Sequence, residues 1–231
     1  MLIGTAWHEG VFEPEVFAGR YVSYHKARNL NHAEYQEFLA LEDVSHEHVF
    51  TERSLAEVHD LIASANRSPV IQWMKESGAP EKVIFWTDPR TGVKCRCKLD
   101  WADPDRFMVG EGKTILSVYG DTIAREAGKR GYWFQAVHNL DGFCMATRGT
   151  VVDWDDPEFD IPIYPFVFTG KDSSHKTVAR VFTREEMQKA AKVRQGLLSR
   201  VAKCVETGIW PGVSQDLSPI ELSKWAIPDV A

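Results

Sequence analysis

The clearest alternation of apolar and polar positions lies between residues 93 and 115. Apolar and polar residues take turns along this stretch, as Val93, Cys95, Cys97 and Leu99 against Lys94, Arg96, Lys98 and Asp100. This period of two is typical of a strand with one buried face. Asp103-Pro104-Asp105-Arg106 has the composition of a turn, and a second apolar run follows it. With the apolar run that precedes the turn at residues 88–92, the pattern predicts three adjacent strands, at 81–86, 93–101 and 107–115.

Helical spacing of apolar positions marks most other elements. Helices are predicted over residues 5–11, 54–65, 68–78, 121–129, 131–140 and 183–208, with capping boxes at Ser54 and Thr183. Strand-like stretches are predicted at 144–152, 161–169 and 175–182, and the polar stretch 21–35 predicts a loop with a short helix. The strands and helices predict an α/β fold in a single domain over residues 1–231, and the length also allows two smaller domains.

Length and composition support a globular chain. A chain of 231 residues with 44% hydrophobic residues can bury a sizeable core. No run of about 18 apolar residues occurs, and the N-terminus lacks the pattern of a secretory signal, so we expect a cytoplasmic protein without a membrane partner. The four cysteines, Cys95, Cys97, Cys144 and Cys204, do not have zinc-ligand spacing and are interpreted as reduced thiols.

Charge limits the kind of nucleic-acid binding that the chain supports. The net charge of −6 argues against a general nucleic-acid binder. Basic residues nevertheless gather on both sides of the central strands, as Arg90, Lys94, Arg96 and Lys98 before them and Arg125, Lys129 and Arg130 after them. Such clusters are either solvated faces or contacts to phosphates.

The central strands also carry the candidate chemistry. Glu111 and Lys113 are two residues apart on one strand and therefore share a face, and a hairpin can bring Asp100 to them. Two converging carboxylates repel each other unless a cation lies between them, and Mg²⁺ prefers such oxygen ligands. A neighbouring lysine can position a water molecule or offset charge on a phosphate. The triple fits metal-dependent phosphodiester hydrolysis; the alternative is a surface hairpin with scattered charges.

Further segments extend this pattern over nearly the whole chain, from residue 3 to about 226. They are Gly4-x-Ala6-x-His8 with Phe12-Glu13-Pro14, Glu81 ahead of the first central strand, Gly131-Tyr132-x-x-Gln135-Ala136, Trp210-Pro211-Gly212, and residues 222–226, in which Lys224 replaces an expected Pro. With Asp100, Glu111 and Lys113, this order resembles the PD-(D/E)XK nuclease superfamily. It is most similar to the phage recombination exonucleases related to the nuclease domain of RecE.

The resemblance implies an α/β restriction-endonuclease-like fold, with a central mixed sheet flanked by helices, and a role for each matched residue. Asp100 and Glu111 would hold the metal, helped by His8, Glu81 and a backbone carbonyl at Gly112 or Lys113. Lys113 would activate the attacking water, and Gln135 and Tyr132 would support Lys113 or the scissile strand. Asn139 stands where relatives often have the Tyr of a Q-x-x-x-Y pattern. The expected phosphate contacts are Arg96 and Lys98, with Arg20 and Arg28 in or near the polar stretch that precedes residue 35.

The same resemblance implies a Mg²⁺-dependent exodeoxyribonuclease, with Mn²⁺ able to substitute. It would degrade linear double-stranded DNA from its ends, 5′ to 3′, and leave 3′ single strands for an annealing protein. A ring-shaped homo-oligomer is expected on the same ground. Two alternatives stay open: a DNA-end binding protein that has lost the chemistry, and a nuclease of the other polarity that is similar either to RecB or to the CRISPR-associated nucleases of this superfamily. The CRISPR-associated relatives usually hold an iron–sulfur cluster on four cysteines, which the placement of Cys95 and Cys97 on a central strand does not favour.

Overall fold

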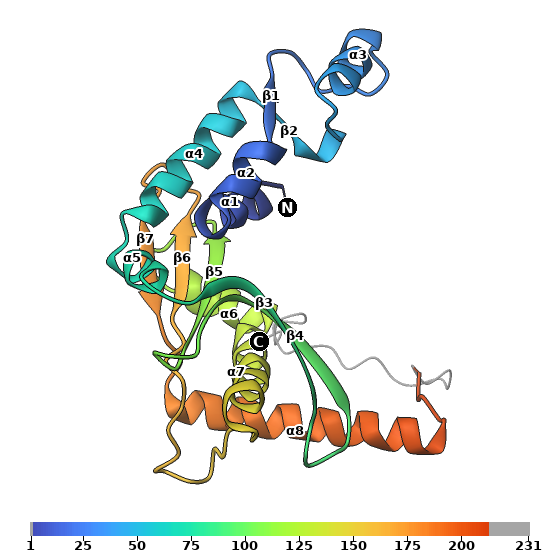
Figure 1. The fold of residues 1–231 in the computed structure, drawn as a ribbon, viewed down its shortest axis with the longest axis vertical. Helices are drawn as coiled ribbons and strands as arrows, with labels where there is room; N and C mark the ends of the chain where they lie inside the picture. The colour runs from blue at the N-terminus through green and yellow to red at the C-terminus, as the bar shows by residue number, and fades with distance from the viewer. Residues whose placement is uncertain (1, 213–231) are drawn as a thin grey trace, which may run out of the picture.

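The computed structural model describes residues 2–212, so the matched segment at residues 222–226 lies outside the described part. A five-stranded sheet lies at its centre, in the order β3-β4-β5-β6-β7 (Figure 1). Its strands are β3 (Ala79–Thr87), β4 (Lys94–Asp103), β5 (Met108–Ile115), β6 (Phe166–Gly170) and β7 (Thr177–Arg180). β5 and β6 are parallel, and the other neighbouring pairs are antiparallel. The predicted mixed sheet is confirmed, including all three central strands.

Helices cover both faces of this sheet. On one face pack α1 (Leu2–Phe12), α4 (Glu52–Asn66) and α5 (Pro69–Lys75), whose apolar side chains meet Trp101, Met108 and Val167 of the sheet. On the other face lie α6 (Thr122–Arg130), α7 (Tyr132–Arg148) and α8 (Arg184–Thr207), around the larger core cluster (Figure 1). β5 is buried on both sides because it lies between these two layers.

A smaller lobe extends beyond α1 and α4, at the top of Figure 1. It contains α2 (Pro14–Arg20), β1 (Val22–Tyr24), α3 (Ala33–Leu41), the 3-10 helix η1 (His46–His48) and β2 (Val49–Thr51). β1 and β2 pair in parallel, and the lobe has its own aromatic cluster around Tyr24 and Tyr35. The predicted loop over residues 21–35 is therefore only partly right, because the segment supplies β1 and the start of α3.

Local signals explain where several helices begin and end. The capping box at Thr183 is present, with Glu186 as its partner, and α8 ends at Gly208 in the left-handed conformation with φ of 70°. The capping box predicted at Ser54 is wrong. The N-cap of α4 is Thr51, whose side chain accepts a hydrogen bond of 3.2 Å from the Ser54 backbone N–H.

Two of the predicted strands differ from the structure. The strand predicted at 144–152 is wrong, because α7 continues to Arg148 and ends only at Gly149, with φ of 72°. The apolar residues up to Cys144 belong to the buried face of that helix. The strand predicted from residue 161 begins at Phe166, after Pro162 and Pro165, which have no N–H to donate to a sheet. None of the helices in residues 2–212 has the length and apolarity needed to cross a membrane.

Candidate active site

Three acidic residues form a row across β3, β4 and β5. The register pairs Pro80 with Trp101 and Lys82 with Leu99, which places Glu81 opposite Asp100. On the other side of β4, the antiparallel register with β5 pairs Trp101 with Gly110, so Asp100, the residue before Trp101, lies opposite Glu111, the residue after Gly110. The row exists because the turn before β5 fixes the pairing of the two strands that carry Asp100 and Glu111.

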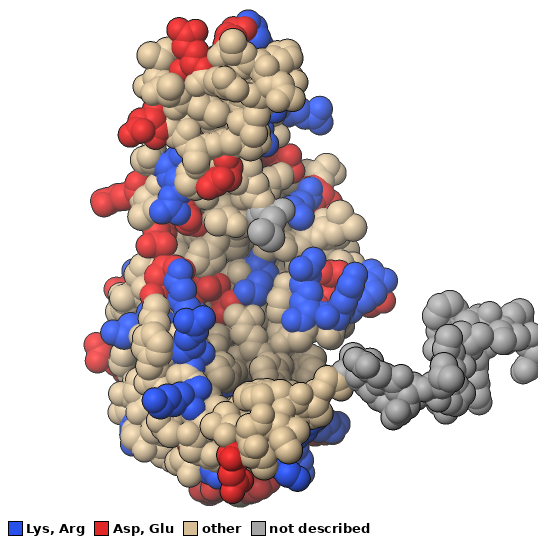
Figure 2. Space-filling view, turned by 90° about the vertical axis from the view of Figure 1, so that its right-hand side faces the viewer, with Lys and Arg blue, Asp and Glu red and all other residues tan. Residues whose placement is uncertain are grey.

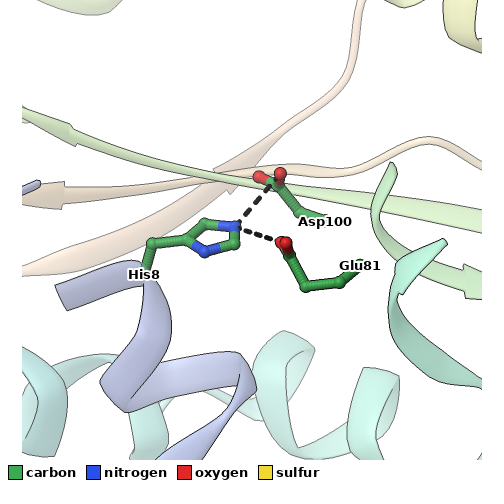
Figure 3. A group of neighbouring side chains, drawn as sticks. All are labelled: His8, Glu81 and Asp100. Atoms are coloured by element: carbon green, nitrogen blue, oxygen red, sulfur yellow. Dashed lines mark ion pairs between the residues drawn. The ribbon is translucent and has the colours of Figure 1, made fainter. Parts of the chain in front are cut away.

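The helix α1 brings His8 to this row. Its Nε2 atom lies 3.1 Å from Asp100 Oδ1 and 3.7 Å from Glu81 Oε1 (Figure 3). One ligand atom from each of the three residues lies within 4.8 Å of the others. The second Asp100 oxygen, Oδ2, accepts a hydrogen bond of 2.9 Å from the Gly112 backbone N–H, which fixes the carboxylate on the strand.

The donors of this group suit a divalent cation. Two carboxylates and one imidazole converge, and His8 Nε2 is buried without a hydrogen bond of its own, although both carboxylates are close. Carboxylates are the ligands that Mg²⁺ and Mn²⁺ prefer, and a neutral imidazole nitrogen adds a donor that Mn²⁺ accepts more readily than Mg²⁺. The three residues therefore fit the predicted metal.

Glu111 belongs to a second, more deeply buried group beside the first. It is 1% exposed and lies next to Lys113 Nζ, which forms an ion pair with Glu111 Oε1. Gln135 Nε2 on α7 donates a hydrogen bond of 2.6 Å to the same oxygen, and the Tyr164 hydroxyl donates one of 3.0 Å to Oε2. Asn139 Nδ2 in turn donates to the Tyr164 hydroxyl at 2.8 Å. Glu111 is thus oriented by three side chains, Lys113, Gln135 and Tyr164, rather than by solvent.

Burial and neighbouring charges shift the pKa values of Asp100, Glu111 and Lys113. Burial raises the pKa of Glu111 to about 7, and the neighbouring Asp100 carboxylate adds to the effect. Burial alone would raise the pKa of Asp100 as well, but His8 and Lys113 outweigh it and hold that pKa below its ordinary value. The pKa of Lys113 is raised because Glu111 and Asp100 outweigh its burial. Lys113 is therefore a charged ammonium beside two carboxyl groups of unequal acidity.

A cleft of about 510 Å³ opens over these residues. Its walls come from α1, β3, β4 and β5, with His8, Glu9, Glu81, Lys98, Asp100 and Lys113 among the lining residues. The His8–Glu81–Asp100 group and Lys113 therefore line the same cleft. Its volume is large enough for a phosphate and its sugar.

The residues predicted to contact DNA lie in different settings. Lys98 lines the cleft and forms an ion pair with Glu81. Tyr132 is buried, and Lys113 Nζ lies 5.4 Å from the centre of its ring. Arg20 is paired with the buried Glu9. Arg96 is exposed. Arg28 donates a hydrogen bond to the Val49 carbonyl. Contact with DNA stays a prediction for all five.

Two polar residues of the site are absent from the predicted set. Tyr164 supplies the hydroxyl that reaches Glu111, from the segment between α7 and β6. In the sequence Asn139 stands out only as a departure from the Q-x-x-x-Y pattern, yet its amide donates to that hydroxyl. Asn139 lies four residues after Gln135 and therefore on the same face of α7, and this spacing is the signal in the sequence that places it near the site. Nothing in the sequence near Tyr164 pointed to Glu111, 53 residues away.

This combination of a mixed sheet, an aspartate on one strand and a Glu-x-Lys on the next defines a PD-(D/E)XK-like domain. The chain belongs to the family described as PDDEXK-like domain of unknown function, whose sequence model matches residues 1–219. The predicted superfamily and fold class are confirmed.

A search of the solved structures finds a similar fold in a crystal structure from Eubacterium rectale, described as a "Putative exonuclease". The two chains share 13% sequence identity with a TM-score of 0.51, over 83% of this chain and 72% of the other. At this identity the similarity shows the shared fold. Among curated proteins, none matches the chain.

Proposed function

We propose that this protein is a divalent-metal-dependent nuclease that degrades linear double-stranded DNA from its ends. The observation that carries the proposal is the meeting, in one cleft, of the His8–Glu81–Asp100 group with Lys113. Membership in a PDDEXK-like family supports a nuclease, and the description of the similar structure as an exonuclease supports action at the ends of a nucleic-acid chain.

Each residue has a role that follows from its position. His8, Glu81 and Asp100 would hold Mg²⁺ or Mn²⁺, and Glu111 and the Gly112 carbonyl are the further predicted ligands beside them. The bound ion supplies positive charge at the scissile phosphate and lowers the pKa of a coordinated water. Lys113 Nζ borders the cleft, where it can donate a hydrogen bond to the attacking water or to a phosphate oxygen.

The surrounding side chains position these groups. Gln135 and Tyr164 fix both oxygens of Glu111, and Glu111 fixes the ammonium of Lys113. The Tyr132 ring borders the same ammonium and limits its movement. Such fixed donors and acceptors lower the reorganisation needed when charge develops on the phosphate.

The finer parts of the proposal rest on the resemblance to phage recombination exonucleases. They are Mg²⁺ as the working ion, 5′ to 3′ polarity, a 3′ single strand passed to an annealing protein, a ring-shaped homo-oligomer and a cytoplasmic location. A ring that encloses the DNA would make degradation processive.

The test is degradation of a linear duplex labelled at one 5′ end, with Mg²⁺, with Mn²⁺ and with EDTA. We expect metal-dependent release of the 5′ label as mononucleotide by the wild type and its loss in Lys113→Ala. Lys203→Ala, at an exposed lysine of α8, is the matched control and should cut normally. Release from the 3′ end first would assign the other polarity. Binding without cleavage by the wild type would contradict the proposal and favour an end-binding protein.

A further inference from the structure

The β3–β4 hairpin has one face that no described element covers. Its inner face packs on α7 through Trp86, Cys97 and Leu99. Its outer face carries Val83, Phe85, Lys94, Arg96 and Lys98, which we call the outer strip. The register pairs Val83 with Lys98 and Phe85 with Arg96, so apolar and basic side chains lie side by side. Phe85 is 73% exposed and Val83 48% exposed, which is unusual for large apolar residues in the middle of a strand.

Two of the three basic residues of the outer strip are available for a ligand. Within residues 2–212, the side chains of Lys94 and Arg96 have no ion-pair or hydrogen-bond partner, while Lys98 pairs with Glu81. Alternate residues on a strand are roughly 6.6 Å apart, a spacing comparable to that of successive phosphates in an extended nucleic-acid strand. In a chain with net charge −6, three basic side chains in one such row give this face a charge opposite to that of the molecule as a whole.

The outer strip also leads to the candidate active site. Lys98 lines the cleft, and Asp100 follows it on the same strand. The Phe85–Arg96 pair lies four residues before Asp100, a distance of roughly 13 Å along the strand. Figure 2 shows Lys and Arg side chains gathered across the middle of the molecule on the face that it presents. A DNA strand with one phosphate at the His8–Glu81–Asp100 group can therefore continue from that group along the outer strip.

We propose that the outer strip binds a single-stranded segment of the DNA strand that continues into the cleft. Lys94, Arg96 and Lys98 contact successive phosphates, and a base stacks on the Phe85 ring. This inference rests on the proposed nuclease function, which supplies the destination of the strand. Intact duplex fits less well, because its bases are stacked inside the helix, where the Phe85 ring does not reach them.

The test is binding of a fluorescein-labelled oligothymidylate, measured by anisotropy in EDTA, with a blunt-ended DNA hairpin as the duplex probe. Phe85→Leu keeps an apolar side chain but removes the ring, and Phe85→Trp restores a stacking surface. We expect about a tenfold loss of single-strand affinity in Phe85→Leu, recovery in Phe85→Trp, and no change in the salt dependence of either.

The charge variants address the phosphate contacts. Lys94→Ala/Arg96→Ala should weaken binding and lower the slope of log Kd against log salt by about 0.7 for each side chain removed. Lys82→Ala is the matched control, because this exposed lysine of β3 pairs with the buried Leu99 position and lies on the opposite face of the hairpin. It should bind like the wild type.

Three results would overturn the inference: no binding of the oligothymidylate by the wild type, unchanged affinity in the Phe85 and double variants, or an equal loss of affinity for the duplex probe. The binding assay requires no cleavage. If the wild type cuts DNA and the variants of the outer strip bind single strands like the wild type, the proposed role of the outer strip is wrong and the nuclease function stands. If binding depends on the outer strip but the wild type never cuts DNA, only the proposed nuclease function is wrong.

Discussion

Glu81 lies opposite Asp100 on the neighbouring strand, and its backbone is in the left-handed region with φ of 56°. Pairing continues on both sides of this position, so the flanking ladder holds the unfavourable conformation in place. A non-glycine residue in this region costs roughly 1 kcal/mol or more. The strain coincides with the point where the Glu81 carboxylate meets His8 and Asp100. We interpret it as the conformation that directs this carboxylate toward the metal group.

Glu81→Asn should therefore stabilise the metal-free protein and weaken its metal binding. Asn adopts the left-handed conformation more readily than Glu, and the substitution removes one of two facing carboxylates. We expect the free energy of unfolding in EDTA to rise by roughly 1 kcal/mol. Mn²⁺ affinity, measured by calorimetry, should fall. Glu34→Asn, which also breaks an exposed Lys–Glu pair, is the control and should give no gain in stability. A less stable Glu81→Asn protein would show that the strain is not relieved.

The raised pKa of Glu111 predicts a pH-dependent stability that Glu111→Gln lacks. A carboxyl group with a folded pKa of about 7, against 4.5 ordinarily, favours the folded state below about pH 4.5 and loses that contribution as the pH rises to 7. The wild type should therefore lose stability relative to Glu111→Gln between pH 5 and pH 8, by on the order of 2 kcal/mol. Urea unfolding in EDTA at both pH values measures this difference. An equal difference at the two pH values would mean that Glu111 titrates normally.

Much of the site follows from local patterns in the sequence. Strand alternation and the turn at residues 103–106 were sufficient to predict that Asp100, Glu111 and Lys113 share one hairpin, because their positions depend on pairing between consecutive strands. His8 and Gln135 were placed through family motifs, and the structure brings both to these carboxylates.

What the sequence did not predict depends on contacts between distant segments. Tyr164 meets Glu111 only because β6 pairs in parallel with β5, a pairing that no local pattern specifies. The helix predicted over residues 131–140 extends to Arg148 as α7. Its last part was predicted as a strand because a buried helix and a buried strand are both continuously apolar over a few residues. The left-handed backbone of Glu81 has no signal in a stretch that otherwise alternates like a strand.

Tyr164→Phe should slow catalysis without removing metal binding. The substitution takes away the donor to Glu111 Oε2 and leaves the Asn139 amide without its acceptor. Loss of a hydrogen bond to a charged group is worth roughly 1.5–3 kcal/mol, so we expect kcat to fall roughly ten- to a hundredfold with Mn²⁺ affinity little changed. Tyr119→Phe, at an exposed tyrosine, is the control. Unchanged kcat in Tyr164→Phe would mean that Glu111 needs no orientation from this side.

Arg194 of α8 should prove essential for stability rather than for chemistry. It is buried with Asp88 and Asp141, and its guanidinium donates to Asp141 Oδ2 at 2.6 Å and to Asp88 Oδ2 at 3.4 Å. Arg194→Met leaves two buried carboxylates without this cation, so the free energy of unfolding should fall by roughly 3–5 kcal/mol.

The control for Arg194→Met is Arg200→Met, an exposed position on the same helix, which should change stability by less than about 0.5 kcal/mol. Burial raises the pKa of Asp141, so the stability that Arg194→Met loses should become smaller as the pH falls and this carboxyl takes up a proton. Equal stability of the two variants in urea unfolding would contradict a structural role for the Arg194 network.

Metal binding should be visible as added stability, independent of any nuclease assay. At a free Mn²⁺ concentration of 100 times its Kd, the free energy of unfolding of the wild type should rise by about 2.7 kcal/mol, and EDTA should reverse the gain. Asp100→Asn should lose it, because Asp100 is the acidic residue closest to His8. Asp105→Asn, in the exposed turn before β5, should keep it. Stabilisation of Asp100→Asn equal to that of the wild type would place the ion elsewhere.

The imidazole of His8 makes a further prediction about which ion binds better. A nitrogen donor favours Mn²⁺ over Mg²⁺, whereas carboxylates serve both ions. The wild type should therefore bind Mn²⁺ more tightly than Mg²⁺, and His8→Ala should reduce the ratio of the two affinities more than it reduces Mg²⁺ affinity itself. Calorimetric titration of both ions measures this ratio directly. A ratio unchanged in His8→Ala would mean that His8 orients Asp100 and contacts the substrate without binding the ion.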